Sequence, residues 1–244
     1  MLRSTKDLMT YRMEAKDGVI GKVSDFYFDD AKWTVRYVVA DTHVWRPGRK
    51  VLISPVAFGE PDWTSHHIRV NLPKNQLENS PDIDEHKPLS RQLEEEISKH
   101  FRWPMYWQAP LVGPLPPPTD LELAAPAAVE VKPAEPNLQS MRDVSGYHIA
   151  AKDGEAGHLD DFVLDTEGWI IRYVVVDTRN WLPGKKVLIS PDWIRELEWS
   201  DARVKVDLTQ DRIKNSPEYD PNTPVNRQYE TRLYDFYGRP HYWA

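Results

Sequence analysis

The chain has 244 residues, of which 40% are hydrophobic and 28% charged, a composition typical of a globular protein with a substantial core. It contains no cysteine, which excludes disulfides, thiolate metal sites and cysteine nucleophiles. The net charge of -7 argues against a protein that wraps nucleic acid, and no apolar run approaches the roughly 20 residues that cross a bilayer. The N-terminal segment lacks the apolar core of a secretory signal, so we expect a cytoplasmic protein.

The first predicted elements are short strands. The turn signal Lys16-Asp17-Gly18 precedes a segment rich in β-branched and aromatic residues, and Pro47-Gly48 fits a type II turn between two further segments of this kind. Short strands at a spacing of about ten residues predict a small closed β-barrel. The predicted strands are residues 21–28, 33–41, 50–54 and 67–72.

A helical tail with an aromatic end follows these strands. Pro88 stands where the first helical position is expected, and aromatic residues crowd the stretch from Trp103 to Trp107. We favour packing of these aromatics back onto the barrel over a docking surface for a partner. The apolar residues that recur every four positions, on one helix face, are Leu89, Leu93, Ile97 and Phe101.

Residues 108–137 form a proline- and alanine-rich linker. The segment contains eight prolines, and each proline fixes φ and lacks the amide donor of a helix or sheet. We therefore predict an extended, semi-stiff spacer. Covering an edge of a neighbouring module is the alternative role.

The remainder of the chain repeats the first part at a constant offset of 136 residues, without a gap. Residues 2–107 and 138–243 are identical at 43 of 106 paired positions. Each copy has roughly 100 residues, the size of one domain. We therefore predict two modules, residues 1–107 and 138–244, each with strands followed by a helical, aromatic-rich extension.

Three short motifs occur in the same order in both copies. In the first copy they are Gly21-Lys-Val-Ser-Asp25, Tyr37-Val-Val39 and Leu52-Ile-Ser-Pro55, and residues 157–161, 173–175 and 188–191 repeat them. Their order and spacing resemble the PRC-barrel family, named for the cytoplasmic domain of the photosynthetic reaction-centre H subunit. The resemblance implies a mainly β fold of two small PRC-type barrels in tandem, used as adaptors that contact proteins, with no catalytic residues.

The same resemblance has limits. The H subunit has a transmembrane helix, and the ribosome-maturation factor RimM carries its PRC-barrel behind a different N-terminal domain. This sequence matches neither the transmembrane helix of the H subunit nor the N-terminal domain of RimM. Membrane anchoring and a role in ribosome maturation therefore do not transfer directly. Resemblance in fold is an analogy and does not identify a site.

We find no pattern typical of a catalytic, metal or cofactor site. None of the eight histidines has a histidine at its offset position, so histidine chemistry is not shared by the copies. There is no glycine-rich phosphate loop and no nucleophile elbow. For the repeated aspartates we favour backbone hydrogen bonding at turns and strand ends over acid–base catalysis.

Arg36 and Arg172 are predicted to form structural ion pairs. Each lies on the strand face opposite the neighbouring tyrosine, between apolar residues, where an unpaired charge is costly. Anion binding by these arginines is the alternative. The expected carboxylate partners are Asp25 or Asp41 for Arg36, and Asp161 or Asp177 for Arg172.

The best interaction candidate is the Pro-Gly loop of each copy, where a tryptophan stands beside basic residues. Such a loop can anchor a protein interface, stack a base or meet an acidic lipid surface. The alternative, which we slightly favour, is that the tryptophans cap the barrel mouths while the cations stay solvated. The candidate residues are Trp45, Arg46, Arg49, Lys50, Trp181, Lys185 and Lys186.

These observations predict a non-enzymatic adaptor or scaffold that binds other proteins. The two modules either display two sites across the spacer or pair through a pseudo-two-fold interface, as a homo-oligomer of single modules would. The alternatives are a peripheral component of a photosynthetic or respiratory membrane complex at the inner membrane, a ribosome-maturation accessory factor, and an enzyme for a small polar ligand. Nucleic acid is not expected as a partner, because neither copy is basic.

Overall fold

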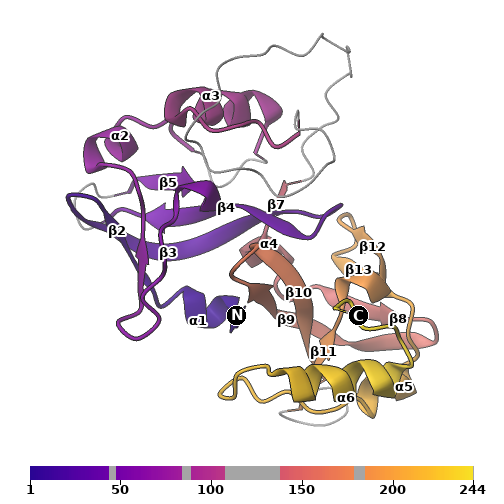
Figure 1. Cartoon of the computed structure of the whole chain (residues 1–244). Helices are drawn as coiled ribbons and strands as arrows, with labels where there is room; N and C mark the ends of the chain where they lie inside the picture. The colour runs from indigo at the N-terminus through magenta and orange to yellow at the C-terminus, as the bar shows by residue number, and fades with distance from the viewer. Residues whose placement is uncertain (44–47, 84–88, 108–137, 179–184, 244) are drawn as a thin grey trace.

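The computed structural model describes residues 1–43, 48–83, 89–107, 138–178 and 185–243. The predicted linker lies outside these residues, as do Pro88 and the loop residues Trp45, Arg46 and Trp181. The described chain is mainly β, as predicted, and its 13 strands form one sheet (Figure 1).

The first copy supplies strands that are rich in valine and aromatic residues, and most of their residues are buried. Its strands are β1 (Leu2–Ser4), β2 (Arg12–Ala15), β3 (Gly18–Asp29), β4 (Thr34–Asp41), β5 (Lys50–Ile53) and β6 (His67–Arg69). Its helices are α1 (Thr5–Leu8), the 3-10 turn η1 (Pro55–Ala57), α2 (Lys74–Glu78) and α3 (Arg91–Phe101). The four predicted strands correspond to β3, β4, β5 and β6.

The second copy repeats this order. It also has a two-stranded hairpin, residues 194–206, between its 3-10 turn and the helix at residues 210–214. Its strands are β7 (Leu138–Ser140), β8 (His148–Ala151), β9 (Gly154–Asp165), β10 (Ile170–Asp177), β11 (Lys186–Ile189), β12 (Ile194–Glu198) and β13 (Arg203–Val206). Its helices are α4 (Met141–Val144), the 3-10 turn η2 (Pro191–Trp193), α5 (Gln210–Lys214) and α6 (Arg227–Tyr237).

The two copies exchange their first strands. β1 of the first copy pairs antiparallel with β9 of the second, and β7 of the second pairs antiparallel with β3 of the first. Between them β4 meets β10, where Ile171 N donates to Trp33 O at 2.7 Å and Val35 N donates to Trp169 O at 2.8 Å. Because each contact recurs with the roles of the copies reversed, the halves are related by a pseudo-two-fold axis.

The sheet runs through both copies in the order β12-β13-β8-β9-β10-β4-β3-β2-β6, and β11 and β5 pair with β10 and β4. The apolar core also continues across the junction, since the ring centroids of Phe28 and Phe162 lie 5.5 Å apart. Figure 1 shows the first half, indigo to magenta, beside the second half, pink through orange to yellow. The pairing order shows one sheet, and two closed barrels in tandem stay a prediction.

A glycine bends the long strand of each copy. A Cβ on Gly21 would lie 1.8 Å from the Asp41 carbonyl oxygen, and one on Gly157 would lie 2.2 Å from the Asp177 carbonyl oxygen. The pairing register shifts at both places, which marks a β-bulge. Only glycine permits this approach, and Gly157 also has a φ of 111° that favours glycine.

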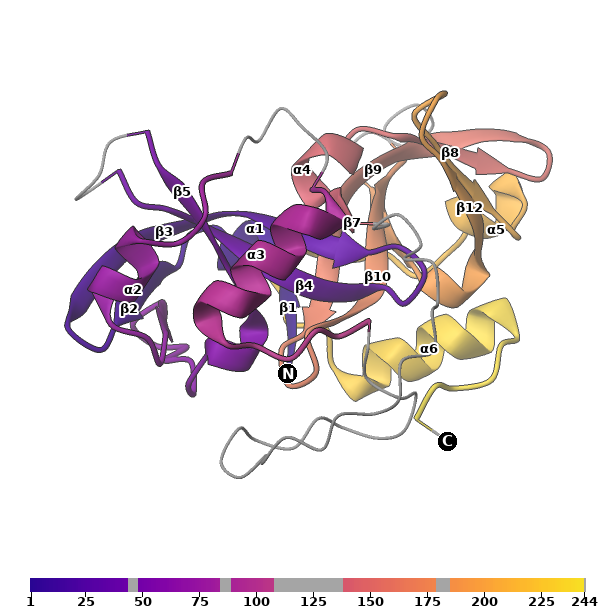
Figure 2. The same ribbon diagram turned by 90° about the horizontal axis from the view of Figure 1, so that it is seen from above.

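The long helices α3 and α6 follow the predicted apolar stripe, which in the second copy is Val225, Tyr229, Leu233 and Tyr237, and Figure 2 shows their places in the molecule. Their N-caps are Ser90 and Asn226, whose side-chain oxygens accept the backbone N–H three residues on. Pro224, the counterpart of Pro88 in the second copy, therefore lies before the cap of α6, and the prediction that this proline is the first helical residue is wrong for the second copy. No helix within the described ranges is long and apolar enough to span a bilayer.

Candidate functional site

Two of the predicted loop cations stabilise helix ends. Arg49 donates from Nη2 to the Ser80 carbonyl oxygen, just after α2. The equivalent Lys185 donates from Nζ to the Lys214 carbonyl oxygen at 2.6 Å, at the end of α5. Lys185 thus satisfies the last carbonyl of α5, where a cation also favours the helix dipole, and Arg49 binds a carbonyl two residues beyond α2. These two side chains therefore have structural contacts, and their role in binding stays a prediction.

The other two described loop cations begin the equivalent strands β5 and β11. Lys50 is half-buried at the start of β5, and Lys186 starts β11. Lys186 Nζ donates to Asp160 at 2.6 Å, and Lys6 of the first copy donates to the other oxygen of the same carboxylate at 2.7 Å. Lys186 thus takes part in a contact between the copies, while a binding role for the loops stays a prediction.

The arginine ion pairs form with carboxylates that we did not predict. Arg36 contacts Asp29 at 2.9 Å, and Arg172 contacts Asp165 at 3.3 Å. Asp29 is the Cα partner of Thr34, so Arg36 lies two residues further along β4 on the same face. The predicted pairing with Asp25 or Asp41, and with Asp161 or Asp177, is therefore wrong, because register brings the last residue of β3 or β9 to the guanidinium.

Asp25 and Asp161 instead hold the two copies together. Asp161 accepts hydrogen bonds from the hydroxyls of Ser4 and Thr5 and, at 3.2 Å, from Lys6 N. Asp25 accepts reciprocally from Ser140 Oγ at 2.5 Å and from the backbone N of residue 142 at 3.2 Å. Burial raises the pKa of both carboxyls above the usual range, although these hydrogen bonds oppose the rise.

Under helix α3 lies a buried group that we name the first glutamate cluster: Tyr37, Arg91, Glu94 and Tyr106. Glu94 accepts from Tyr106 OH at 2.8 Å and from Tyr37 OH at 3.5 Å, and Arg91 Nη1 lies 3.0 Å from its other oxygen. These contacts fasten the helix and the aromatic end of the copy to β4.

The second glutamate cluster, Tyr173, Arg227, Glu230 and Tyr242, occupies the equivalent place under α6. Glu230 accepts from Tyr173 OH at 2.7 Å and from Tyr242 OH at 2.8 Å. Arg227 Nη1 lies 3.0 Å from the remaining carboxylate oxygen. Every member of the first cluster therefore has its counterpart in the second.

The buried carboxyl of the first cluster has the chemistry of a proton donor. Burial raises the pKa of Glu94 to about 7, against the opposing effects of the Tyr106 hydroxyl and Arg91. Such a shift is common at catalytic sites, but ion-pair networks within a fold also produce it. Aromatic rings cover the cluster: Trp107 stacks on Arg91 at 4.2 Å and Tyr106 on Arg36 at 4.1 Å. The cluster therefore lies beneath aromatic rings and connects α3 to β4.

Sequence reasoning missed both clusters, although one signal pointed to them. Within the span of α3 and α6 the only identities between the copies are Arg91, Gln92 and Glu94 with their counterparts. A polar residue retained in a helix whose apolar residues have diverged indicates a specific buried partner. The structure shows that partner to be a tyrosine pair.

Comparison with known proteins gives no assignment. A scan against protein-family models finds no match to the chain. A search of curated proteins also finds no match. The resemblance to the PRC-barrel family therefore stays a prediction.

Proposed function

We propose that the protein is a non-enzymatic adaptor in which two PRC-type modules are fastened to each other and bind partner proteins as one rigid body. The observation that carries this proposal is the fate of the ionisable groups that both copies retain. Asp25, Asp29 and Glu94, with their counterparts, bind hydroxyls, backbone amides and arginines of the same chain. Their repeated chemistry supports folding and pairing of the modules.

We also infer that each copy closes into a barrel through one bent strand. In the second copy β11 pairs with β10, and after η2 the chain continues as β12, which pairs with β13. Strands β13, β8, β9 and β10 pair in that order. The bent segment of β11 and β12 therefore closes the series, because its first part pairs with β10 and its second part pairs with β13. In the first copy Phe58 bridges to Val70 in the corresponding place after η1. This closure supports the likeness to the PRC-barrel family.

The exchanged strands favour pairing of the modules over wide-span bivalent display. Backbone hydrogen bonds of β1 to β9 and of β7 to β3 hold the copies in one orientation. Two sites on such a body would have a constant separation, whatever the length of residues 108–137. Shortening that segment while it still spans residues 107 and 138 should therefore leave partner affinity unchanged, whereas bivalent display across the spacer predicts a change.

The adaptor function is tested by quantitative affinity capture from native lysate. The comparison is between the parent, the Trp45→Ala/Trp181→Ala double variant, and Val56→Ala as a matched surface control, since Val56 is 49% exposed. We expect a set of proteins that the parent and control capture and that the double variant loses at an unchanged melting temperature. Equal capture by all three folded proteins contradicts a partner site on the loops.

A further inference from the structure

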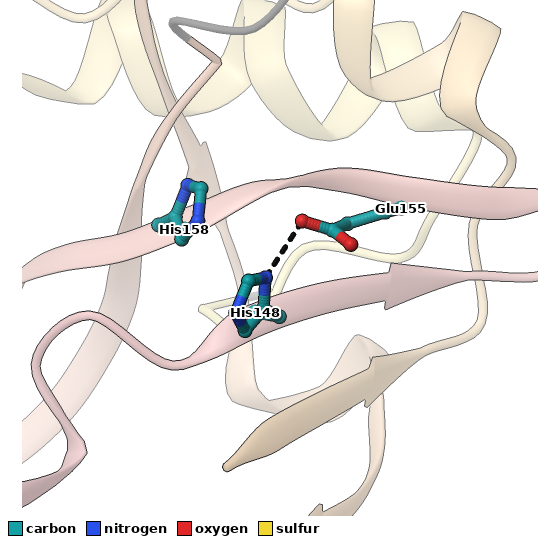
Figure 3. Close-up of side chains that lie close together, drawn as sticks. All are labelled: His148, Glu155 and His158. Atoms are coloured by element: carbon teal, nitrogen blue, oxygen red, sulfur yellow. Dashed lines mark hydrogen bonds and ion pairs between the residues drawn. The ribbon is translucent and has the colours of Figure 1, made fainter. Parts of the chain in front are cut away.

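Three potential metal ligands converge on the outer face of the β8–β9 hairpin (Figure 3). His148 lies on β8, and Glu155 and His158 lie on β9. The two histidines are directly opposite each other in the antiparallel pair, and their ring centroids are 4.6 Å apart. They therefore present two imidazoles side by side.

The β-bulge brings Glu155 to the same face. Residues three apart in a regular strand point to opposite faces of a sheet. Here Ala156 and Gly157 are both buried in succession, and the register passes from His148 opposite His158 to Ala150 opposite Glu155. The extra residue reverses the alternation, so the carboxylate and the imidazole of His158 lie on one side.

The spacing of the ligand atoms suits a small divalent cation. His148 Nδ1 and Glu155 Oε1 are 2.6 Å apart, and one ligand atom from each of the three residues lies within 4.8 Å of the others. A tetrahedral zinc ion with bonds of about 2.1 Å separates its ligands by about 3.4 Å. Shifts of about 1 Å in side chains that are 45% and 48% exposed, at His148 and Glu155, reach that geometry.

Charge also favours a cation between these residues. Glu155 supplies an anionic oxygen ligand between two imidazole nitrogen donors. Arg203 is the charged neighbour from the adjacent strand β13, in register with His148. Its guanidinium opposes a metal ion, while the exposed hairpin leaves that charge in solvent.

The first copy shows that the fold does not require these residues. The same bulge occurs at Gly21, but the three equivalent positions carry Arg12, Val19 and Lys22. Two cations stand where the second copy has two imidazoles, and an apolar side chain stands where it has a carboxylate. The ligand set is therefore a property of the second copy alone.

We propose that His148, Glu155 and His158 bind one zinc-class divalent transition-metal ion. Two imidazole nitrogens and one carboxylate oxygen select such an ion over magnesium or calcium, which prefer oxygen ligands. Three protein ligands leave a coordination position for water or for an external group. The site is independent of the adaptor proposal and shares no residue with either glutamate cluster.

The test uses the full chain without a polyhistidine tag, with zinc chloride titrated calorimetrically into metal-stripped protein. The variants His148→Arg and His158→Lys introduce the residues of the first copy. We expect one zinc per chain for the parent and at least tenfold weaker binding for each variant, at an unchanged melting temperature in chelator.

The matched control is His67→Arg, which also introduces the residue of the other copy. His67 Nδ1 lies 3.8 Å from Glu14, and the described part of the chain places no third ligand with them, so this variant should bind zinc like the parent. Parent binding weaker than about 1 mM, or equal affinities of the parent and His158→Lys, would overturn the proposal.

Discussion

The two copies of the module are alike at their buried polar contacts and differ on the outer faces of their first hairpins. Glu94 and Glu230 hold the same set of tyrosines and arginine, and Asp25 and Asp161 make the same exchange contacts. On the hairpin formed by β2 and β3, or by β8 and β9, the cation Lys22 corresponds to His158. Burial therefore constrained one set of residues, while solvent exposure left the other set open to new chemistry.

The buried contacts themselves differ in strength between the copies. Tyr173 OH lies 2.7 Å from Glu230, whereas Tyr37 OH lies 3.5 Å from Glu94. The second carboxylate thus has two short hydroxyl bonds, and the first has one. This difference is open to measurement, as are the features that the copies share.

The largest expected effect comes from the bulge glycines, which both copies need. Gly21→Ala and Gly157→Ala drive a Cβ into a backbone carbonyl, so each should lower the free energy of unfolding by about 3 kcal/mol. Urea denaturation measures this, with Gly59→Ala as a control because its Cβ would find no atom closer than 3.5 Å. A midpoint for Gly157→Ala equal to that of the control would show that the second bulge tolerates a side chain.

The arginine ion pairs should show a smaller effect, with the first copy more sensitive. Arg36→Ala removes the contact with Asp29, a pair whose side chains are 16% and 12% exposed, and should cost about 2 kcal/mol. Arg172→Ala should cost less, about 1 kcal/mol, because that pair is longer and 25% and 23% exposed. Thermal melts of both variants test the order. A variant that melts like the parent but loses a bound anion would favour anion binding.

The first glutamate cluster predicts a pH dependence. Because the pKa of Glu94 is raised to about 7, the folded chain holds a proton that the unfolded chain releases above about pH 4.5. Its contribution to stability is therefore complete at low pH and is lost as pH rises through the folded pKa. Glu94→Gln should remove about 2 kcal/mol of the fall in unfolding free energy between about pH 5 and 7.

Glu230→Gln is the matched comparison for that experiment, since Glu230 has the same set of partners. Chemical denaturation across the pH range gives the difference between each variant and the parent, which cancels the titration of all other groups. Parallel profiles for the parent and Glu94→Gln would show that the glutamate is ionised throughout.

The smallest expected effect concerns the metal ligands of the second copy. Arg203→Gln removes the cation in register with His148 and should tighten zinc binding roughly threefold. Lys205→Gln is the control, because Glu196 and Glu198 already hold that ammonium at 3.1 and 2.8 Å. Calorimetric zinc titration measures the affinity of each variant. Weaker zinc binding by Arg203→Gln than by the parent would indicate that the guanidinium positions Glu155 instead.

Local patterns allowed the strands and helices to be predicted, since their signals depend on neighbouring residues. The β-branched runs became β4 and β10, and the four-residue stripe became α3 and α6. The exchange strand β1 was not predicted, because a three-residue segment has no periodicity and its pairing is with β9. The N-caps were also misplaced, because a nearby proline was preferred to Ser90 as the start signal.

The candidate site was less predictable for a related reason. Arg36 was expected to need a carboxylate, and it has one, but Asp29 rather than Asp25 or Asp41 is within reach. Choosing among three aspartates requires the register of two strands, including a bulge that shifts it. The metal-ligand cluster was missed likewise, because Glu155 and His158 share a face only where the strand is bulged.

The amino-acid sequence by itself determined that one module occurs twice, that each is built mainly of strands, and that a helix with an aromatic end closes each copy. These properties follow from the composition of each segment, the identity between the two copies and the period of the apolar residues, all of which can be determined without knowing which segments meet in the fold. Only the tertiary structure decided which charges meet, as when Asp25 accepts a hydrogen bond from Ser140, 115 residues away. Such partners depend on strand exchange and register, and the free energy of burying a charge selects them only once the whole sheet has formed.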